Sequence, residues 1–254
     1  MRMITTRATD ARPGVWAMTG AAIAALLLLA GLGGCVDVDK LVKQVDGMQG
    51  GGLSQEKIIA GLKQALEIGS ERAAGAVGRL NGYYKNPQIR IPLPEDLRRL
   101  EHTLRTVGYG SKVDAFELSM NRAAERAAPA AKRIFIGAVR DMSFADARKI
   151  LDGGDDAATE YFRKKTYAQL ERAFQPTVHS AMSHVGVTHQ YQRLQTKLES
   201  IPFTAGLTTN IDTYVTDRAL DGLFHTLAAE ERRIRRDPVA RTTELLKEVF
   251  GSRN

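Results

Sequence analysis

Cysteine is almost absent from this sequence, because Cys35 is the only one among 254 residues. A single thiol cannot form an intramolecular disulfide, so packing alone must stabilise the fold. The same scarcity excludes a zinc site built from cysteine pairs. The one cysteine therefore needs a role of its own, and the residues around it suggest one.

Common catalytic signatures are also missing from the sequence. We find no Gly-x-Ser-x-Gly, no His-Glu-x-x-His and no phosphate-binding glycine loop. His179, His184 and His189 are spaced by five, which spreads them around a helix and predicts no metal site. We therefore expect no cofactor and no bound metal, and no activity can be assigned from motifs.

The residues before Cys35 have the layout of an export signal. Arg2, Arg7 and Arg12 precede an uncharged, largely apolar run over residues 14–34. The run ends in Leu32-Gly33-Gly34-Cys35, which resembles the lipobox of bacterial lipoproteins. This resemblance implies that residues 1–34 are a signal peptide that is removed, and that Cys35 is lipidated and becomes the new N-terminus.

Two other interpretations of the apolar run remain open. A run of about 20 uncharged residues is long enough to anchor the chain in a bilayer directly, and an ordinary secretory signal carries no lipid. The residue after the cysteine is Val36 rather than aspartate. In enteric-type lipoproteins this favours sorting to the outer membrane, so we expect a chain on its periplasmic face.

The charge of the exported part argues against nucleic acid as a partner. Removing residues 1–34 takes away three arginines and one aspartate, which changes the formal charge from +7 to +5. This charge is mild and dispersed along the 220 remaining residues. An anionic membrane surface or an acidic polymer of the envelope fits such a chain better.

Apolar residues recur at helical spacing through most of the mature chain. Residues 35–52 end in three glycines and read as a flexible tether. Residues 53–254 form one all-α domain of about eight to ten helices, because no sustained strand pattern, internal repeat or second boundary appears. We expect helices over residues 55–80, 94–107, 111–142 with a break at Pro129, 143–153, 155–165, 166–185 with a kink at Pro176, 187–201, 211–236 and 239–250.

Proline interrupts this helical pattern over residues 86–94. Three prolines in this stretch forbid a helix, and Ile89, Ile91 and Leu93 alternate with other residues. We expect an extended Pro-rich arm that lies over the helices with its apolar side chains buried. Arg90 would then face outward or meet a carboxylate.

Three polar groups are candidates for chemistry. Asp217, Asp221 and His225 are spaced by four, so they share one helix face and could act in acid–base catalysis. Two carboxylates and an imidazole could also hold a divalent metal, but a solvated helix edge explains the three residues better than either kind of site. The outer two are about 12 Å apart along the axis, so one ion cannot bind both without a second helix.

Glu231 lies on the apolar stripe of the same predicted helix, between Leu227 and Ile234. A carboxylate there needs a partner, and Arg235, Arg90 or an arginine of another helix could supply it. A structural ion pair explains Glu231 better than a catalytic site does, because such pairs are common in cores.

Arginines gather at the end of that helix, at positions 232, 233, 235, 236 and 241. Cations favour a helix C-terminus, so a solvated face is one explanation. The other explanation is contact between an anionic headgroup or phosphate and Arg232, Arg233, Arg236 and Arg241.

Four stretches together resemble one bacterial lipoprotein family, the domain of unknown function 4197. They are residues 86–94 (Asn-Pro-Gln-Ile-Arg-Ile-Pro-Leu-Pro), residues 157–163 (Ala-Ala-Thr-Glu-Tyr-Phe-Arg), residues 214–224, which begin Tyr-Val-Thr-Asp, and residues 230–247, which begin Glu-Glu. The resemblance covers about residues 53–251 and implies an exported, lipid-anchored helical domain. It brings no catalytic residue with it.

We therefore hold three hypotheses. The first is a non-enzymatic envelope lipoprotein whose periplasmic domain binds or scaffolds another envelope component. The second is an enzyme acting on an envelope substrate through Asp217, Asp221 and His225. The third is a carrier with an apolar cavity between helices rich in small residues.

Overall fold

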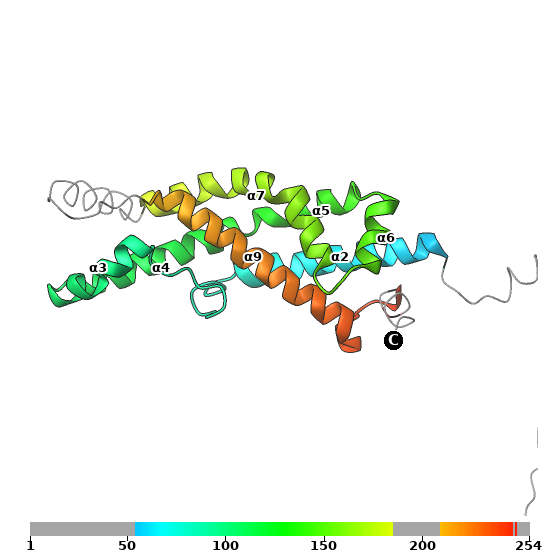
Figure 1. Cartoon of the computed structure of the whole chain (residues 1–254), viewed down its shortest axis with the longest axis horizontal. Coiled ribbons are helices and arrows are strands. Elements are labelled where there is room, and N and C mark those ends of the chain that lie inside the picture. Colours follow the sequence, from blue (N-terminus) through cyan, green and yellow to red (C-terminus); the bar gives the residue numbers. More distant parts are fainter. Residues whose placement is uncertain (1–53, 185–208, 246, 248–254) are drawn as a thin grey trace, which may run out of the picture. The chain divides into compact units, whose positions relative to one another are not determined.

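The computed structural model describes residues 54–184, 209–245 and 247 of the chain. The chain divides into two compact units, Met1–Gly52 and Leu53–Asn254, and all described residues belong to the second. This second unit is all-α, with no strand among the residues that the structure describes (Figure 1). Its elements are α2 (Gln55–Gly78), α3 (Glu95–Thr106), α4 (Gly110–Ala127), α5 (Ala130–Arg140), α6 (Phe144–Asp152), α7 (Ala157–His184), α9 (Ile211–Arg236) and the 3₁₀ turn η1 (Pro238–Ala240).

Several helix ends lie where the sequence predicts them. The hydroxyl of Ser54 accepts a hydrogen bond from the Lys57 amide and caps α2. Ser143 and Asp146 form a reciprocal capping box that begins α6. Pro129 separates α4 from α5, and α9 runs from Ile211 to Arg236. Local chemistry is enough to fix these boundaries.

Two predicted boundaries are wrong, at Thr166 and at Val239. The sequence suggested two helices meeting at Thr166, but α7 is continuous from Ala157 to His184 and passes through Pro176. The hydroxyl of Thr166 donates to the carbonyl of Phe162, 2.6 Å away and one turn earlier, and the side chain is buried. Because a carbonyl of the same helix accepts the hydrogen bond of this hydroxyl, Thr166 does not cap the start of a new helix. The helix predicted over 239–250 does not begin at 239, because residues 238–240 form the 3₁₀ turn η1 and residues 241–243 are not helical. The predicted helix over 187–201 lies outside the described residues, as do positions 246 and 248–250.

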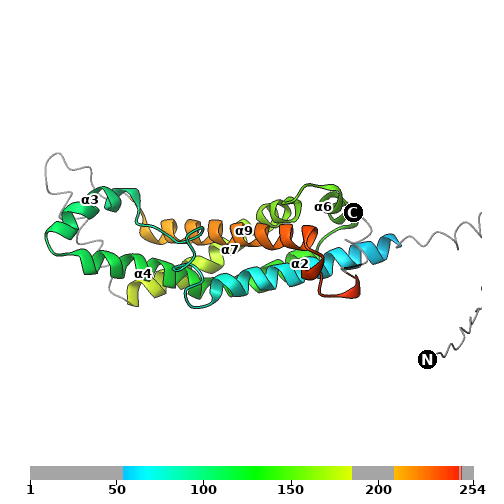
Figure 2. The ribbon, with the colours of Figure 1, turned by 90° about the horizontal axis from the view of Figure 1, so that it is seen from below.

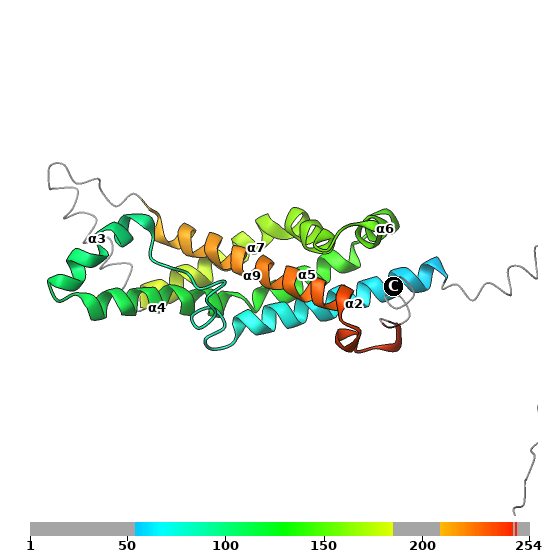
Figure 3. The ribbon, with the colours of Figure 1, turned by 60° about the horizontal axis from the view of Figure 1, so that its bottom comes forward.

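Helix α9 is the centre of the unit. It packs along both α7 and α2, and α4 packs against α7 (Figures 2 and 3). Phe135 of α5, Phe162 of α7 and Phe224 of α9 form an aromatic cluster, with ring centroids 4.9 and 6.0 Å apart. All three side chains are buried, so each buries about the full hydrophobic area of its ring and joins a different helix to the core.

Residues 79–94, between α2 and α3, contain turns and no helix. Ile89, Ile91 and Leu93 are buried, whereas Arg90 is exposed. The chain reverses at Asn81, whose φ of 66° lies in the left-handed region that asparagine tolerates. At Gly82 a Cβ atom would lie 2.4 Å from the carbonyl oxygen of Val77, so only glycine fits against the end of α2.

Three polar side chains of α4 hold this segment, and we call them the α4 ladder: Glu117, Asn121 and Glu125. They are four residues apart and so lie on one helix face. Glu117 accepts from Arg90 Nε at 2.7 Å, and the Asn121 amide makes two 2.9 Å hydrogen bonds with the backbone N–H and C=O of Ile91. Asn121 and Glu125 therefore replace backbone partners that a segment without secondary structure lacks, and Glu117 holds the segment through the Arg90 side chain.

Glu125 is the last member of the ladder along α4. Its carboxylate is buried and accepts from the backbone amides of Tyr83 and Tyr84 at 3.1 and 3.2 Å. Arg122 pairs with the same carboxylate at 2.5 Å and also donates to the Asn81 side chain at 2.8 Å. This network fixes the turn that follows α2.

Tyr83 inserts from this turn into the core. Its ring is fully buried, and its hydroxyl donates to the carbonyl of Ala219 in the middle of α9 at 2.5 Å. The ring lies against Gly222, where a Cβ atom would be only 2.6 Å from Tyr83 Cε1 and 3.1 Å from Ile89 Cβ. The missing side chain at Gly222 therefore makes room for the tyrosine.

This close approach gives a test of the fold. Alanine normally stabilises a helix by about 1 kcal/mol over glycine, and Gly75→Ala in α2 should do so because nothing lies within 4 Å of its Cβ position. Gly222→Ala should instead lower the free energy of unfolding by about 1–3 kcal/mol, because the methyl overpacks the core. Urea unfolding of both variants measures this, and equal stabilisation by the two would contradict the packing.

Candidate functional site

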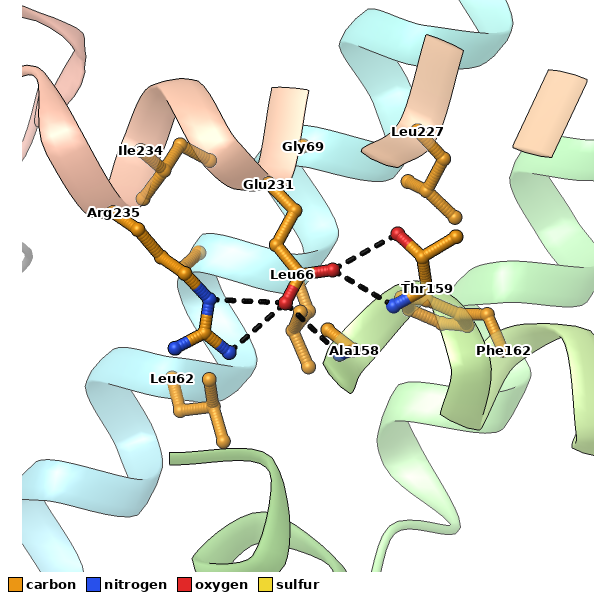
Figure 4. Close-up of a pocket in the computed structure, with 11 residues that line it drawn as sticks. Leu62, Leu66, Gly69, Ala158, Thr159, Phe162, Leu227, Glu231, Ile234 and Arg235 are labelled. Atoms are coloured by element: carbon orange, nitrogen blue, oxygen red, sulfur yellow. Dashed lines mark hydrogen bonds and ion pairs between the residues drawn. The ribbon is translucent and has the colours of Figure 1, made fainter. Parts of the chain in front are cut away.

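The most elaborate polar cluster in the described part of the chain surrounds Glu231 (Figure 4). Its carboxylate accepts from the backbone amides of Ala158 and Thr159 at 2.9 and 2.8 Å, and from the Thr159 hydroxyl at 2.9 Å. Arg235 approaches the same carboxylate through Nε at 3.0 Å and Nη2 at 2.9 Å. Both side chains are largely buried, so this is an ion pair inside the protein.

Glu231 in effect caps a helix to which it does not belong. Ala158 and Thr159 are in the first turn of α7, where backbone amides have no partner within the helix. An anion at that position also interacts favourably with the helix dipole. Arg235 donates further to the carbonyl of Ile150 in α6 at 2.9 Å. One buried pair thus joins α9, α7 and α6.

A small cavity lies beside this pair. Its volume is about 20 Å³, and its walls include Leu62 and Leu66 of α2, Phe162 of α7 and Ile234 of α9. A space of this size holds about one water molecule, whereas ligand pockets typically measure about 300–1,000 Å³. It has no room for a substrate or an acyl chain. The geometry of the Glu231 cluster therefore indicates a structural role, in which it holds helices together.

Of the arginines suggested by the sequence as partners of Glu231, one forms the pair and one does not. Arg235 is the partner of Glu231, but Arg90 is not, because it pairs with Glu117 at 2.7 Å on another part of the surface. Its guanidinium also lies 4.7 Å from the centre of the Tyr84 ring. The sequence does not indicate which carboxylate lies next to the segment that contains Arg90, so its pairing with Glu117 could not be predicted.

Asp217, Asp221 and His225 do not converge. Asp217 accepts from the Tyr167 hydroxyl at 3.4 Å, and Asp221 lies 3.6 Å from Arg163 of α7. Asp221 and His225 are both exposed. Within the described ranges, no three His, Cys, Asp or Glu side chains are placed to hold a metal ion. The three residues line an exposed helix edge that contacts α7 by single polar interactions.

The arginine-rich end of α9 is mostly consumed by partners. Arg232 pairs with Asp156 at 2.5 Å, Arg236 with Asp155, and Arg233 lies 3.6 Å from Glu230. Arg241 contradicts the prediction of a surface contact, because it is buried and donates to the carbonyls of Ile234 and Arg235 at 3.2 and 2.9 Å. It caps the C-terminus of α9, where four carbonyls lack helical partners.

A surface depression at the end of α2 was not predicted from the sequence. It has a volume of about 540 Å³ and is open to solvent. We call it the α2-end groove, and its lining includes Arg79, Leu80, Asn81, Lys85, Asn86 and Thr226. The Asn81-Gly82 pair signalled a turn, but no pattern indicated that α9 would close one side of it.

The comparison with protein families gives one match. Residues 52–251 match the family model described as protein of unknown function (DUF4197). The chain belongs to this family. No curated protein and no solved structure matches the chain. The resemblance found in the sequence is thereby confirmed, and DUF4197 membership extends over nearly all of the second unit.

The stretches that carried the DUF4197 resemblance contact one another in the fold. Residues 157–163 supply the amides that Glu231 caps. The Tyr214 hydroxyl donates to the carbonyl of Pro92 at 3.0 Å, which joins α9 to the segment before α3. In this DUF4197 chain, the motif residues with such contacts therefore hold the helices together.

Cys35 and the signal-like segment lie outside the described residues, as does His189. No helix of the described part has both the length and the apolar character needed to cross a membrane.

We predict that Glu231→Gln lowers the free energy of unfolding by about 3–5 kcal/mol, because it breaks a buried ion pair and leaves Arg235 unpaired. Urea titration followed by circular dichroism measures the shift in midpoint. Glu244→Gln is the matched control, since Glu244 is exposed and pairs with Lys247 at the surface, where such pairs contribute about 0–1 kcal/mol. Equal effects of the two substitutions would refute a structural role for Glu231.

A second prediction concerns alkaline pH. Burial raises the pKa of Tyr83 well above its usual value, and the charges of Glu125 and Asp221 raise it further. Because the folded pKa exceeds the unfolded value of about 10, the stabilisation is complete below pH 10 and is lost as the pH rises above it. Above pH 10, Tyr83→Phe should therefore reduce the loss of stability by on the order of 1 kcal/mol per pH unit.

Burial also raises the pKa of Tyr161, Tyr167 and Tyr214. The wild type and every variant therefore share the part of the stability loss at high pH that these three tyrosines cause. The comparison of Tyr83→Phe with Tyr109→Phe, an exposed tyrosine, isolates the buried one. Identical slopes above pH 10 would argue that Tyr83 is accessible to water.

Proposed function

We propose that this chain is a lipid-anchored lipoprotein of the cell envelope whose helical domain binds or scaffolds another envelope component, without catalysing a reaction. In this proposal Cys35 carries the lipid, residues 36–52 are the tether, and the domain faces the periplasm from the outer membrane. The observation that carries it is the placement of Leu32-Gly33-Gly34-Cys35 between an export-like segment and the family domain.

The domain boundary supports this arrangement. The family match begins at residue 52, and the second compact unit begins at Leu53. In this proposal, residues 36–51 lie between the lipidated cysteine and the start of the family match. A short segment ending in three glycines suits a flexible connection between an anchored cysteine and a folded unit.

The polar groups of the core favour binding over catalysis. Glu231 and Glu125 are the buried carboxylates that the described part of the chain places in its interior, and both are surrounded by donors that shape the backbone. A catalytic acid or base must be able to reach a substrate proton. These two groups face backbone amides and arginines instead.

The enzyme and carrier hypotheses receive less support from the geometry. Asp217, Asp221 and His225 do not converge, and none of them lines either of the two hollows described above. The cavity beside Glu231 is too small for an acyl chain. Of the two hollows described above, the larger is the open α2-end groove, which suits contact with a partner.

We predict that Cys35→Ser abolishes lipid attachment, because the hydroxyl does not replace the thiol in this modification. Cells producing wild type or variant are labelled with a fatty acid and then separated into membrane and soluble fractions. The wild type should carry label in the membrane, and the variant should carry none and leave it. Val38→Ser, three residues further on, is the control and should keep the label. Equal labelling of wild type and Cys35→Ser would sink the proposal.

A further inference from the structure

The α2-end groove presents hydrogen-bond donors to solvent and lacks acidic groups. None of its lining residues is aspartate or glutamate, whereas Arg79 and Lys85 are both exposed cations. Elsewhere on the described surface most arginines pair with carboxylates, as Arg90 and Arg232 do. Within the described part of the chain, neither Arg79 nor Lys85 has a carboxylate in ion-pair distance, so the groove is locally positive.

The neutral side chains of the groove also present donors, and their orientation follows from their partners. The Oδ1 atom of Asn81 accepts from Arg122, and the Oδ1 atom of Asn86 accepts from the backbone amide of Gln88. Both partners can only donate, which fixes which end of each amide is the oxygen. The acceptors of Asn81 and Asn86 are thus occupied, and their NH₂ groups remain for a ligand.

Apolar surface accompanies these donors. Leu80 is 73% exposed, although large aliphatic side chains are usually buried, and it lies in the same lining as Arg79 and Pro87. A ligand that fits this lining offers carboxylate oxygens and apolar side chains at short spacing. The volume of about 540 Å³ is within the usual range of ligand sites.

The groove is also rigidly built. Its floor is the turn that Arg122 and Glu125 fix from α4, and Gly82 packs directly on the last carbonyls of α2. The hydroxyl of Thr226 donates to the carbonyl of Gly222 one turn earlier, so the α9 wall is held as well. Preorganised donors lose little entropy when a ligand binds.

We propose that the α2-end groove binds a short acidic segment of a partner protein, in which aspartate or glutamate side chains alternate with apolar ones. Arg79 and Lys85 contact the carboxylates, the amides of Asn81 and Asn86 donate to the same oxygens or to the peptide backbone, and Leu80 packs against an apolar side chain. This inference rests on the proposed binding role and names the chemistry of the partner.

Two observations favour a peptide over an anionic membrane surface. Binding of a basic segment to a membrane typically uses a cluster of about 4–8 cations on one surface, whereas this groove contributes only Arg79 and Lys85. The site is also hollow, and its donors lie among apolar residues. A planar bilayer presents headgroups on a flat surface, but a peptide side chain can enter a depression.

The experiment uses the full mature chain, purified in detergent. A fluorescein-labelled eight-residue peptide of alternating leucine and glutamate is titrated with the protein, and fluorescence anisotropy reports binding. Peptides with glutamine or lysine in place of glutamate are the comparison ligands. We expect binding of the glutamate peptide alone, with an affinity that falls as salt is added.

Substitutions then locate the site. Arg79→Gln and Lys85→Gln should each weaken binding about tenfold, the loss expected for one charge-assisted hydrogen bond, and Leu80→Ser should weaken it as well. Lys112→Gln, which removes an exposed cation of α4 outside the groove, is the matched control and should bind like wild type. Circular dichroism confirms that each variant is folded.

Three results would overturn the proposal. The first is no binding of the glutamate peptide by a folded wild-type chain. The second is equal weakening by Lys112→Gln, which would reveal non-specific attraction. The third is that vesicles of phosphatidylglycerol bind the wild type while the peptide does not, and that Arg79→Gln abolishes vesicle binding. Lipid attachment at Cys35 is measured separately, so a failure here is distinguishable from a failure of the proposed anchoring.

Discussion

The buried carboxylate of Glu231 is the interaction on which the arrangement of the C-terminal half depends. The backbone amides of Ala158 and Thr159 in the first turn of α7 meet the oxygens of Glu231 on α9. Removing a carboxylate and an arginine from water is costly, and only complete pairing offsets that cost. Because the donors to Glu231 come from α7 and α9, and the carbonyl that accepts from Arg235 comes from α6, the cluster is satisfied in one arrangement of the three helices.

On the opposite side of α9, the α4 ladder likewise uses polar side chains to hold a segment of backbone in place. Residues 79–94 lack helix and strand partners, so their backbone groups need others. Asn121 and Glu125 supply them one helical turn apart, and Glu117, one turn earlier, pairs with the side chain of Arg90. In both places a polar side chain in the interior orients backbone rather than performs chemistry. This explains why a chain with many charged residues and few catalytic signatures still buries carboxylates.

Much of the helical content was predictable, because it follows from local chemistry. The bounds of α9, the caps at Ser54 and Ser143 and the break at Pro129 depend on residues within a few positions of each other. The continuity of α7 was missed because Thr166 resembles a cap in sequence, but its hydroxyl bonds within the helix. The burial of Glu231 and its pairing with Arg235 were among the predicted options, since both lie on one helix. Its bonds to Ala158 and Thr159, the pairing of Arg90 with Glu117 and the α2-end groove bring distant segments together, and no periodicity encodes them.

The position of α9 in the chain has a consequence for biogenesis. Tyr83 donates to a carbonyl 136 residues later, and Ala158 to a carboxylate 73 residues later. Contacts between such distant parts cannot form until the later part exists, and they slow folding because large loops must close first. Until α9 emerges, the preceding helices lack their central partner and their apolar faces stay open. A nascent chain of this protein therefore cannot complete its core until nearly all of it has been made, which suits the export across a membrane that we propose.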